Sequence, residues 1–516
     1  MAALSLFILS LLALYLVCLA RTQATVLRVS VALLLVLVVL ASLCLDGWRW
    51  PRAALWLWVL ALGGCLLVRS RTAAAGAGRS RPRWLFACGA CISWCALNLA
   101  QQSVASLTLP ALSGPYPVSQ HQWTVQSQRQ DLHSPDPFAR REFLVNVYYP
   151  TLVNGAIQRA PYLSEPMMRA TFFQHAPLLQ RFFFEREVMR LRSQSWEGMG
   201  SGLSPVQAKY PIVIFSPGLG WFAAMHTFYL EQLASQGYVV FAITHPGDSD
   251  LVEFPDGRQV RGGWSAGAPV EDEGTSNRRQ AQEAQLHETL EQLLATGGTP
   301  SQAQLRALQA PNTSPTRDHP LAVRRDDVVD LLDRLAALNS GSPVSQFAGR
   351  LDMDNIAVTG MSYGGPTASD VCLQDQRCKV VVNLDGEEFG RLPLETNTRP
   401  ALWLYRMDRW QGAFLRRIAF ERYAGPAYRV GFTGARHATF SDQPFWPPEV
   451  DLWGMLLPRW LWDDSSRQEQ ALPPLILAYE LDFLDHYLKG RQLRLLRSAQ
   501  ARSGVAISLK NASDLP

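Results

Sequence analysis

The sequence predicts an α/β protein with a mostly parallel central sheet, preceded by a strongly apolar N-terminal region. Two short stretches, Ile212–Ser216 and Val239–Thr244, are almost continuously apolar and are separated by a helix-compatible segment. A strongly amphipathic helix is predicted at Val328–Leu338, ahead of a further apolar strand. Continuous apolar strands that alternate with helices are typical of a parallel sheet buried on both faces.

The remaining elements of the sheet follow from similar short apolar runs bounded by Gly, Pro or polar residues. We expect further strands at Phe143–Tyr149, Ile356–Thr359, Val380–Leu384 and Leu402–Tyr405, with Tyr428–Phe432 as the last strand. A closing helix is predicted over Pro473–Lys489, where Gly490 is the stop signal. Leu178–Leu191 combines apolar residues at near-helical spacing with Arg and Glu, which indicates either a core-facing helix or a lid that meets lipid.

The first hundred residues predict a bundle of about four transmembrane helices, because a helix needs about 20 apolar residues to cross a bilayer. The apolar stretches are Leu4–Ala20, Val26–Leu45, Ala53–Val68 and Trp84–Ala100. From about residue 105 the composition changes to a mixture of polar and apolar residues. We therefore divide the chain into a membrane region, 1–104, and a second domain, 105–516, which carries a polar insertion around 247–320.

Arginines between the apolar stretches predict the orientation of this bundle. The link Arg69–Arg83 holds five Arg and no acidic residue, so the positive-inside rule assigns it to the cytoplasm. With four crossings, everything after residue 100 lies on the extracytoplasmic side of an inner membrane. If one stretch does not span, the same domain is cytoplasmic.

Composition argues against several classes of function. The chain has 516 residues and a formal net charge of only +4, and no Lys/Arg block in it resembles a nucleic-acid-binding patch, so nucleic-acid binding is not expected. Cys88 and Cys91 form a CxxC without a second ligand pair, so no zinc site is predicted. Cys372 and Cys378 lie close together, and the sequence leaves open whether they form a disulfide.

A G-x-S-x-G motif spans Gly360 to Gly364, with Ser362 at its centre, directly after the strand Ile356–Thr359. A serine between a buried strand and a helix is typical of the nucleophile elbow of the α/β-hydrolase fold, where a tight turn projects its hydroxyl above the sheet. Glycines are needed on both sides because a Cβ atom there would collide with its neighbours. The backbone N–H of Tyr363 is then expected to be one donor of an oxyanion hole.

A serine hydroxyl needs a neighbouring base, and in this fold an acid and then a histidine follow the nucleophile. His437 and His486 are the histidines after Ser362. His486 falls inside the closing helix, whereas His437 follows the last predicted strand, which favours His437 as the base. Asp385 and Asp408 each follow a predicted strand, and spacing alone does not choose between them as the acid. No metal or cofactor is required by this chemistry.

Residues from about 113 to 490 resemble the serine-type platelet-activating-factor acetylhydrolase family, which includes plasma lipoprotein-associated phospholipase A2 and many bacterial relatives. The segments that carry the resemblance are Gly114–Val118, Asp136-Pro137, Val147–Pro150, Phe215–Gly220, Gly360–Gly365, Asn383–Gly386 and His437–Asp442. The resemblance implies that Asp385 is the acid and that the N–H of Leu219 is the second oxyanion donor. Pro217 has no N–H and cannot serve as a donor. His245 either lines the pocket or is structural.

The resemblance implies hydrolysis of short sn-2 acyl esters of glycerophospholipids through an acyl-enzyme, in a membrane-anchored bacterial relative of the family. The expected partners are therefore a lipid or small ester and the membrane. A general short-chain carboxylesterase or polyester hydrolase remains an alternative. A further alternative is a membrane sensor whose hydrolase-like domain binds a ligand without turning it over. A dienelactone hydrolase is disfavoured because such enzymes usually use Cys as nucleophile.

Overall fold

The computed structural model describes residues 109–511 apart from several gaps. The gaps are 132–133, 135, 153–157, 175–184, 186–187, 199–201, 263–284, 287, 290, 294–295, 297, 299, 310–314, 342–344, 410–412, 447–463 and 498–502. The apolar stretches of the first hundred residues and most of the stretch Leu178–Leu191 therefore lie outside the described residues. Among the described helices, none combines the length and apolar character needed to cross a bilayer.

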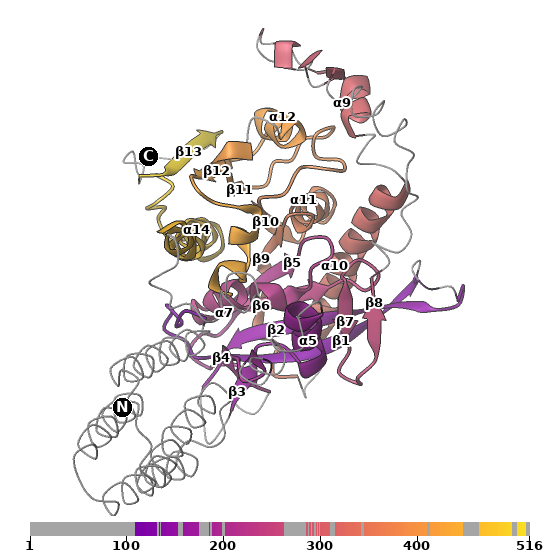
Figure 1. Ribbon diagram of the computed structural model, residues 1–516, viewed down its shortest axis with the longest axis vertical. Coiled ribbons are helices and arrows are strands. Elements are labelled where there is room, and N and C mark those ends of the chain that lie inside the picture. Colours follow the sequence, from indigo (N-terminus) through magenta and orange to yellow (C-terminus); the bar gives the residue numbers. More distant parts are fainter. Residues whose placement is uncertain are drawn as a thin grey trace, which may run out of the picture. The chain divides into compact units, whose positions relative to one another are not determined.

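A large mixed sheet forms the centre of the described part (Figure 1). Its strand order is β13-β12-β11-β10-β9-β5-β6-β2-β1-β4-β3. The strands are β1 Val118–Gln130, β2 Arg140–Pro150, β3 Arg159–Pro161, β4 Arg192–Glu197, β5 Tyr210–Ser216, β6 Val239–Thr244, β9 Leu351–Met361, β10 Cys378–Leu384, β11 Ala401–Arg406, β12 Ala427–Phe432 and β13 Val505–Lys510. A separate hairpin pairs β7 Leu251–Glu253 with β8 Gln259–Arg261.

The predicted parallel sheet corresponds to the six strands from β12 to β6, whose neighbours all pair in parallel. These strands are buried almost throughout, which is why they read as continuous apolar runs. At either side the sheet continues with antiparallel pairs, β6 with β2 and β12 with β13. The fold is thus mixed α/β, with its parallel strands in the middle.

Helices cover both faces of the sheet (Figure 1). The α-helices are α5 Glu165–Phe173, α7 Thr227–Ser235, α9 Gln302–Gln309, α10 Pro315–Gly341, α11 Gly364–Gln374, α12 Phe414–Arg422 and α14 Asp464–Lys489. The 3-10 helices are η1 Ala223–His226, η2 Met407–Arg409, η3 His437–Phe440 and η4 Gln443–Phe445. Helices α10 and α11 contact each other on one face, and α7 and α14 contact each other on the other.

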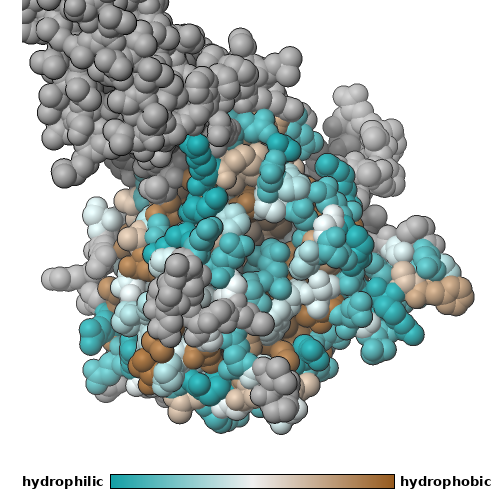
Figure 2. Space-filling model, turned by 90° about the horizontal axis from the view of Figure 1, so that it is seen from below, coloured by the Kyte–Doolittle hydropathy of each residue, from teal (hydrophilic) through white to brown (hydrophobic). Residues whose placement is uncertain are grey.

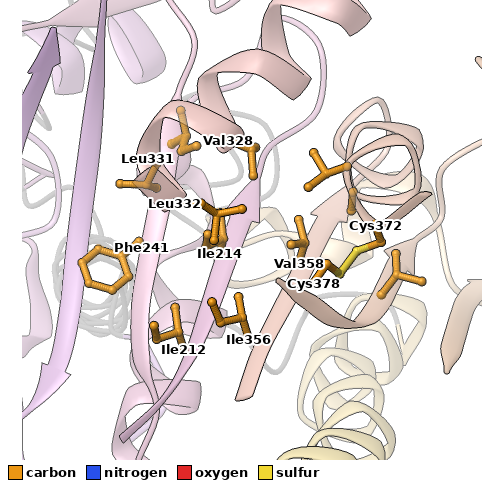
Figure 3. Close-up of a cluster of buried hydrophobic side chains, with 14 of the residues drawn as sticks. Ile212, Ile214, Phe241, Val328, Leu331, Leu332, Ile356, Val358, Cys372 and Cys378 are labelled. Atoms are coloured by element: carbon orange, nitrogen blue, oxygen red, sulfur yellow. A yellow bond between two sulfur atoms is a disulfide. The ribbon is translucent and has the colours of Figure 1, made fainter. Parts of the chain in front are cut away.

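The core beneath α10 explains why this helix is fixed to the sheet. Its side chains Val328, Leu331 and Leu332 are fully buried against the strand residues Ile214 and Val358 (Figure 3). Burying side chains of this size contributes about 1.5–3 kcal/mol each. The charged residues that α10 carries on the same face are thereby held close to the carboxyl ends of the strands.

Cys372 of α11 and Cys378 of β10 form a disulfide, the pairing that the sequence left open (Figure 3). The bridge joins the end of the helix after the predicted nucleophile to the start of the next strand.

Two sequence-based expectations about the elements were wrong, and one long strand was not predicted. The strand β12 is not the last, because the short, partly exposed stretch Val505–Lys510 after the closing helix adds β13 as an antiparallel edge strand. Helix α14 begins at Asp464, ahead of Pro473 and Pro474, which the helix contains. The long strand β1 was not predicted, because most of its residues are polar and the strand is partly exposed. The predicted stop at Gly490 agrees with its positive φ of 68°.

Contacts divide the chain into two compact units, and the unit that carries the sheet comprises Thr108–Met167, Arg192–Trp446 and Asp463–Pro516. Of the described residues, positions 168–174, 185 and 188–191 belong to the other unit.

On the face seen in Figure 2, hydrophobic residues of the described part are scattered between hydrophilic ones. Scattered exposed apolar residues of this kind are normal for a protein surface.

Candidate active site

The candidate site lies where the parallel strands end at their carboxyl edge. Strand β9 leads into Ser362 and its neighbour β10 leads into Asp385, with Met361 and Leu384 paired just before them. His437 follows β12 and begins η3. The parallel register therefore brings together residues that are far apart in the sequence.

Ser362 sits in a strand–turn–helix elbow with a left-handed backbone, at φ 55°. Residues other than glycine rarely adopt this backbone conformation, which costs about 1–3 kcal/mol and persists only where the surrounding structure enforces it. The flanking glycines show how tight the turn is. A Cβ at Gly360 would lie 2.0 Å from the carbonyl oxygen of Gly364, and one at Gly364 would lie 1.9 Å from that of Ser216.

A continuous chain of hydrogen bonds joins the three predicted residues. His437 Nε2 lies 2.8 Å from Ser362 Oγ, and His437 Nδ1 lies 2.7 Å from Asp385 Oδ2. Because a carboxylate can only accept, Nδ1 carries the proton and Nε2 is left to accept from the serine hydroxyl. We call this arrangement the Ser362 relay. Ser362 and His437 are partly exposed, so a substrate can reach them.

Two arginines surround Asp385. Arg406 donates through its backbone N–H and its Nε to the two carboxylate oxygens, at 3.1 and 2.7 Å. Arg416 Nη1 lies 3.6 Å from Oδ1. Burial alone raises the pKa of Asp385, but the hydrogen bond from His437 and the nearby Arg416 and Arg406 outweigh it, so its pKa lies below the usual value. Asp385 is therefore a carboxylate at neutral pH.

Asp408, the other candidate acid, is exposed in η2, whereas His437 is bonded to Asp385. His486 lies on α14 and its Nδ1 contacts the carbonyl oxygen of Arg491. The spacing in the sequence did not separate the two acids because β10 and β11 are neighbours that end at the same edge. Sequence reasoning also missed Arg406 and Arg416, for which the sequence offers no signal.

The loop that carries His437 is fixed on both sides. Thr439 accepts from the backbone N–H of Arg436 and donates to Glu469 of α14. Asp442 accepts from the backbone N–H of Phe228 and from the hydroxyl of Tyr162, at 3.0 and 2.9 Å. Complete burial raises the pKa of Asp442 well above its usual value. These contacts hold the imidazole in place from outside the relay.

Residues Pro217–Gly220, here called the oxyanion loop, follow β5 and lie beside the elbow. A Cβ placed on Gly218 would lie 3.2 Å from Ser362 Cβ, which shows how closely the loop backbone approaches the serine. Gly220 donates to the carbonyl oxygen of Asp248 at 3.1 Å, and Asp250 donates to that of Gly220 at 2.9 Å. Leu219 is half-buried in this loop, and Tyr363 precedes the first turn of α11.

His245 does not line a substrate pocket, because its side chain is fully buried behind the oxyanion loop. Its Nε2 lies 3.0 Å from Ser216 Oγ, and its Nδ1 lies 2.9 Å from Asp327 Oδ2. Arg141 donates to both oxygens of Asp327, at 3.1 and 2.7 Å. Ser216, His245 and Asp327, here called the Ser216 relay, repeat the side-chain order of the Ser362 relay.

A mostly apolar cavity of about 510 Å³ lies at the carboxyl end of β6, between the β7–β8 hairpin and η1. Its lining includes Tyr148, Phe222, Thr244, Leu251 and Phe254. Within the described part of the chain, no cluster of His, Cys, Asp or Glu is arranged to hold a metal ion.

A mostly parallel sheet with a serine elbow at the end of a central strand and a histidine bonded to that serine defines a protein of the α/β-hydrolase class. A solved structure supports this fold. The ferulic acid esterase from Streptomyces cinnamoneus superimposes with a TM-score of 0.56 and 24% identity, over 78% of this chain and 99% of that chain. At this level of identity the likeness concerns the fold alone.

The chain belongs to the platelet-activating factor acetylhydrolase, isoform II, family, whose model matches residues 101–452. The platelet-activating factor acetylhydrolase of Cavia porcellus is 27% identical over 179 residues, which cover 34% of this chain and 35% of that protein. The probable 1-alkyl-2-acetylglycerophosphocholine esterase of Arthroderma benhamiae is 38% identical over 245 residues, which cover 45% and 49%. The chain thus matches about half, or less, of the length of these relatives.

Proposed function

We propose that the protein is a serine ester hydrolase that removes short sn-2 acyl groups from glycerophospholipids of the platelet-activating-factor type. The observation that carries the proposal is the pair of hydrogen bonds, 2.8 and 2.7 Å, that links Ser362 to His437 and His437 to Asp385. Membership of the family and the names of its relatives point to the same ester chemistry.

In the proposed mechanism, Ser362 Oγ attacks the ester carbonyl while His437 Nε2 takes the hydroxyl proton. The carbonyl oxygen becomes negatively charged and is bound by the backbone N–H groups of Leu219 and Tyr363. His437 then gives the proton to the departing lysophospholipid oxygen. Water, activated by the same histidine, releases the acyl group as a carboxylic acid. Asp385 holds the imidazole in the required tautomer and stabilises its charged form.

The surroundings of Asp385 support its role in this scheme. A carboxylate that stays ionised can stabilise the imidazolium as it forms, and the hydrogen bond from His437, together with Arg416 and Arg406, keeps the pKa of Asp385 low. Tyr363 lies at the start of α11, so its N–H belongs to the positive end of a helix dipole, which favours a developing anion.

The experiment compares hydrolysis of an sn-2 acetyl phospholipid with hydrolysis of p-nitrophenyl acetate and its longer-chain relatives, by wild type and Ser362→Ala. We expect the wild type to prefer the phospholipid and the variant to cleave neither. Cleavage of the p-nitrophenyl esters alone would retain the serine mechanism and make the protein a general carboxylesterase. A wild type that cleaves no ester and does not react with a fluorophosphonate would instead indicate a non-catalytic ligand-binding protein.

We also propose that residues 1–104 anchor the protein in a membrane, with the hydrolase domain on the extracytoplasmic side. The proposal rests on the four apolar stretches and on the arginines of the link Arg69–Arg83. The full chain should remain in the membrane pellet after alkaline carbonate extraction, and protease added to spheroplasts should digest the domain. A digest that needs detergent would place the domain on the cytoplasmic side.

A further inference from the structure

Arg324 of α10 lies directly behind the oxyanion loop and is fully buried. Its Nη1 donates to the carbonyl oxygen of Pro217 at 2.7 Å, and its Nη2 donates to that of Gly218 at 3.2 Å. Its Nε donates to Asp248 Oδ2 at 2.6 Å. One guanidinium therefore donates hydrogen bonds to two successive carbonyl groups of the loop, and the Asp248 carboxylate holds the guanidinium in place. We call this arrangement the clamp.

The carbonyl of Gly218 belongs to the same peptide unit as the N–H of Leu219. A peptide unit is planar, and the described residues contain no cis bond, so the C=O and N–H of this unit point in opposite directions. A carbonyl that is held towards Arg324 therefore turns the Leu219 N–H away from α10. A charged donor on the carbonyl also polarises the peptide unit and strengthens its N–H as a donor.

Asp248 connects this clamp to the rest of the loop. Its side chain bonds Arg324, while its backbone carbonyl accepts from the N–H of Gly220. The guanidinium of Arg324 also lies 5.2 Å from the ring centre of Tyr363, the residue that carries the other expected donor. The oxyanion loop and the start of α11 thus share one buried cation.

We propose that Arg324 is a positioning residue that fixes the Gly218–Leu219 peptide so that the Leu219 N–H can bind the oxyanion. This inference rests on the proposed ester hydrolysis and deepens it. A buried ion pair such as Arg324–Asp248 contributes little net stability compared with apolar residues of similar size, so orientation of the loop is the function that its contacts indicate.

The test is the Arg324→Gln variant, assayed on p-nitrophenyl acetate and on its thionoester, in which sulfur replaces the carbonyl oxygen. Loss of one oxyanion donor lowers kcat by about 10²–10³-fold, and a donor that is displaced rather than lost should lower it by about 10–100-fold. KM should change little. Sulfur is a weak hydrogen-bond acceptor, so the kcat for the thionoester should fall much less than the kcat for the oxygen ester. A fold that was merely disturbed would slow both substrates equally.

Two further variants keep the test decisive. Arg324→Gln with Asp248→Asn removes both charges together and avoids leaving a buried carboxylate unpaired. Arg350→Gln is the matched control, because Arg350 also donates to backbone carbonyls, those of Ser204, Gln207 and Ala208, but at the other end of the sheet. The control should keep wild-type kcat on both substrates.

The outcomes separate this inference from the proposed function. A selective loss of kcat on the oxygen ester in the Arg324 variants supports it. Unchanged kcat, or an equal loss on ester and thionoester, overturns it while wild-type activity keeps the hydrolase assignment. A wild type that neither hydrolyses the ester nor reacts with a fluorophosphonate at Ser362 removes both.

Discussion

The described part of the molecule contains two Ser–His–Asp relays at the same edge of one sheet, which share their connectivity but differ in exposure and in the backbone geometry of the serine. The Ser362 relay has bonds of 2.8 and 2.7 Å, and the Ser216 relay has bonds of 3.0 and 2.9 Å. The His437 side chain is 39% exposed, whereas that of His245 is 0% exposed. Ser216 ends an ordinary strand, whereas Ser362 occupies a left-handed elbow.

The comparison separates hydrogen-bond order from the other features that a reactive serine needs. A nucleophile needs access for the substrate, a hydroxyl raised above the sheet and N–H donors for the oxyanion. Ser216 lies behind the loop that is expected to carry one of those donors, so we expect the same side chains there to stabilise the structure. Matched substitutions in the two relays should therefore lower the rate in the Ser362 relay and the stability in the Ser216 relay.

The largest difference is expected between the two serines. Ser362→Ala should lower kcat by roughly 10⁴–10⁶-fold, because the nucleophile is lost. Ser216→Ala should keep kcat within about tenfold and cost about 1–3 kcal/mol of stability, because His245 Nε2 loses its partner. Esterase kinetics and urea unfolding of both variants measure this. Equal losses of rate in the two variants would show that the Ser216 relay takes part in catalysis.

The next largest difference is expected between the acidic residues of the two relays, Asp385 and Asp327. Asp385→Asn should lower kcat by about 10⁴-fold, since an amide cannot hold the same imidazole tautomer or stabilise its charge. Asp327→Asn should instead lower the free energy of unfolding by about 3–5 kcal/mol, because the buried Arg141 loses the charge of the carboxylate that it bonds through two nitrogens and retains the longer contact with Asp131 at 3.5 Å. The pH-independent kcat and the urea midpoint of each variant separate the two effects.

Asp408→Asn is the matched control for the acid, since Asp408 is exposed and also follows a parallel strand. Its kcat should stay within about twofold of wild type, as expected of a surface change. A large loss of kcat in this variant, with Asp385→Asn active, would move the acid to the later strand.

The sequence predicted the positions of Ser362 and His437 because their signals are local. A G-x-S-x-G after an apolar strand and a histidine in the loop after a late strand can be read within a few residues. The choice between Asp385 and Asp408 depended on a family resemblance, because both side chains follow strands that end at one edge. The parallel strands were predictable for the same reason as Ser362, since burial on both faces leaves a continuous apolar run.

Arg324 could not be predicted, because its surroundings in the sequence resemble a solvent-facing charge run. Arg324, Arg325, Asp326 and Asp327 follow one another on α10. Positions 324 and 327 share one face of the helix and their side chains are 0% exposed, whereas those of Arg325 and Asp326 are 24% and 35% exposed. Strand and loop partners that bury two of the four charges appear only in three dimensions.

The buried histidine of the Ser216 relay should make the stability of the protein depend on acid pH. Burial lowers the pKa of His245 from 6.5 to about 4, against the opposing effect of Asp327. In the unfolded chain the His245 imidazole therefore binds a proton near pH 6.5, whereas in the folded protein it binds one only near pH 4. Stability from this group falls as the pH drops through that window, by at most about 3 kcal/mol. His245→Gln should flatten this part of the profile of unfolding free energy against pH, and an unchanged slope would contradict the assignment.

The smallest effect concerns the covalent support that the Ser362 relay has and the Ser216 relay lacks. The Cys372–Cys378 bridge joins α11 to β10, the elements next to Ser362 and Asp385, and closes a loop with a sequence separation of 6. A loop this short restricts the unfolded chain modestly, so reduction should lower stability by roughly 2 kcal/mol. Folded protein should keep its kcat, because Gly360, Gly364 and the strand register still shape the elbow. Thermal unfolding with and without dithiothreitol measures this, and Cys372→Ala with Cys378→Ala should abolish the sensitivity. A fall in kcat on reduction without unfolding would mean that the bridge itself holds the nucleophile in its left-handed conformation.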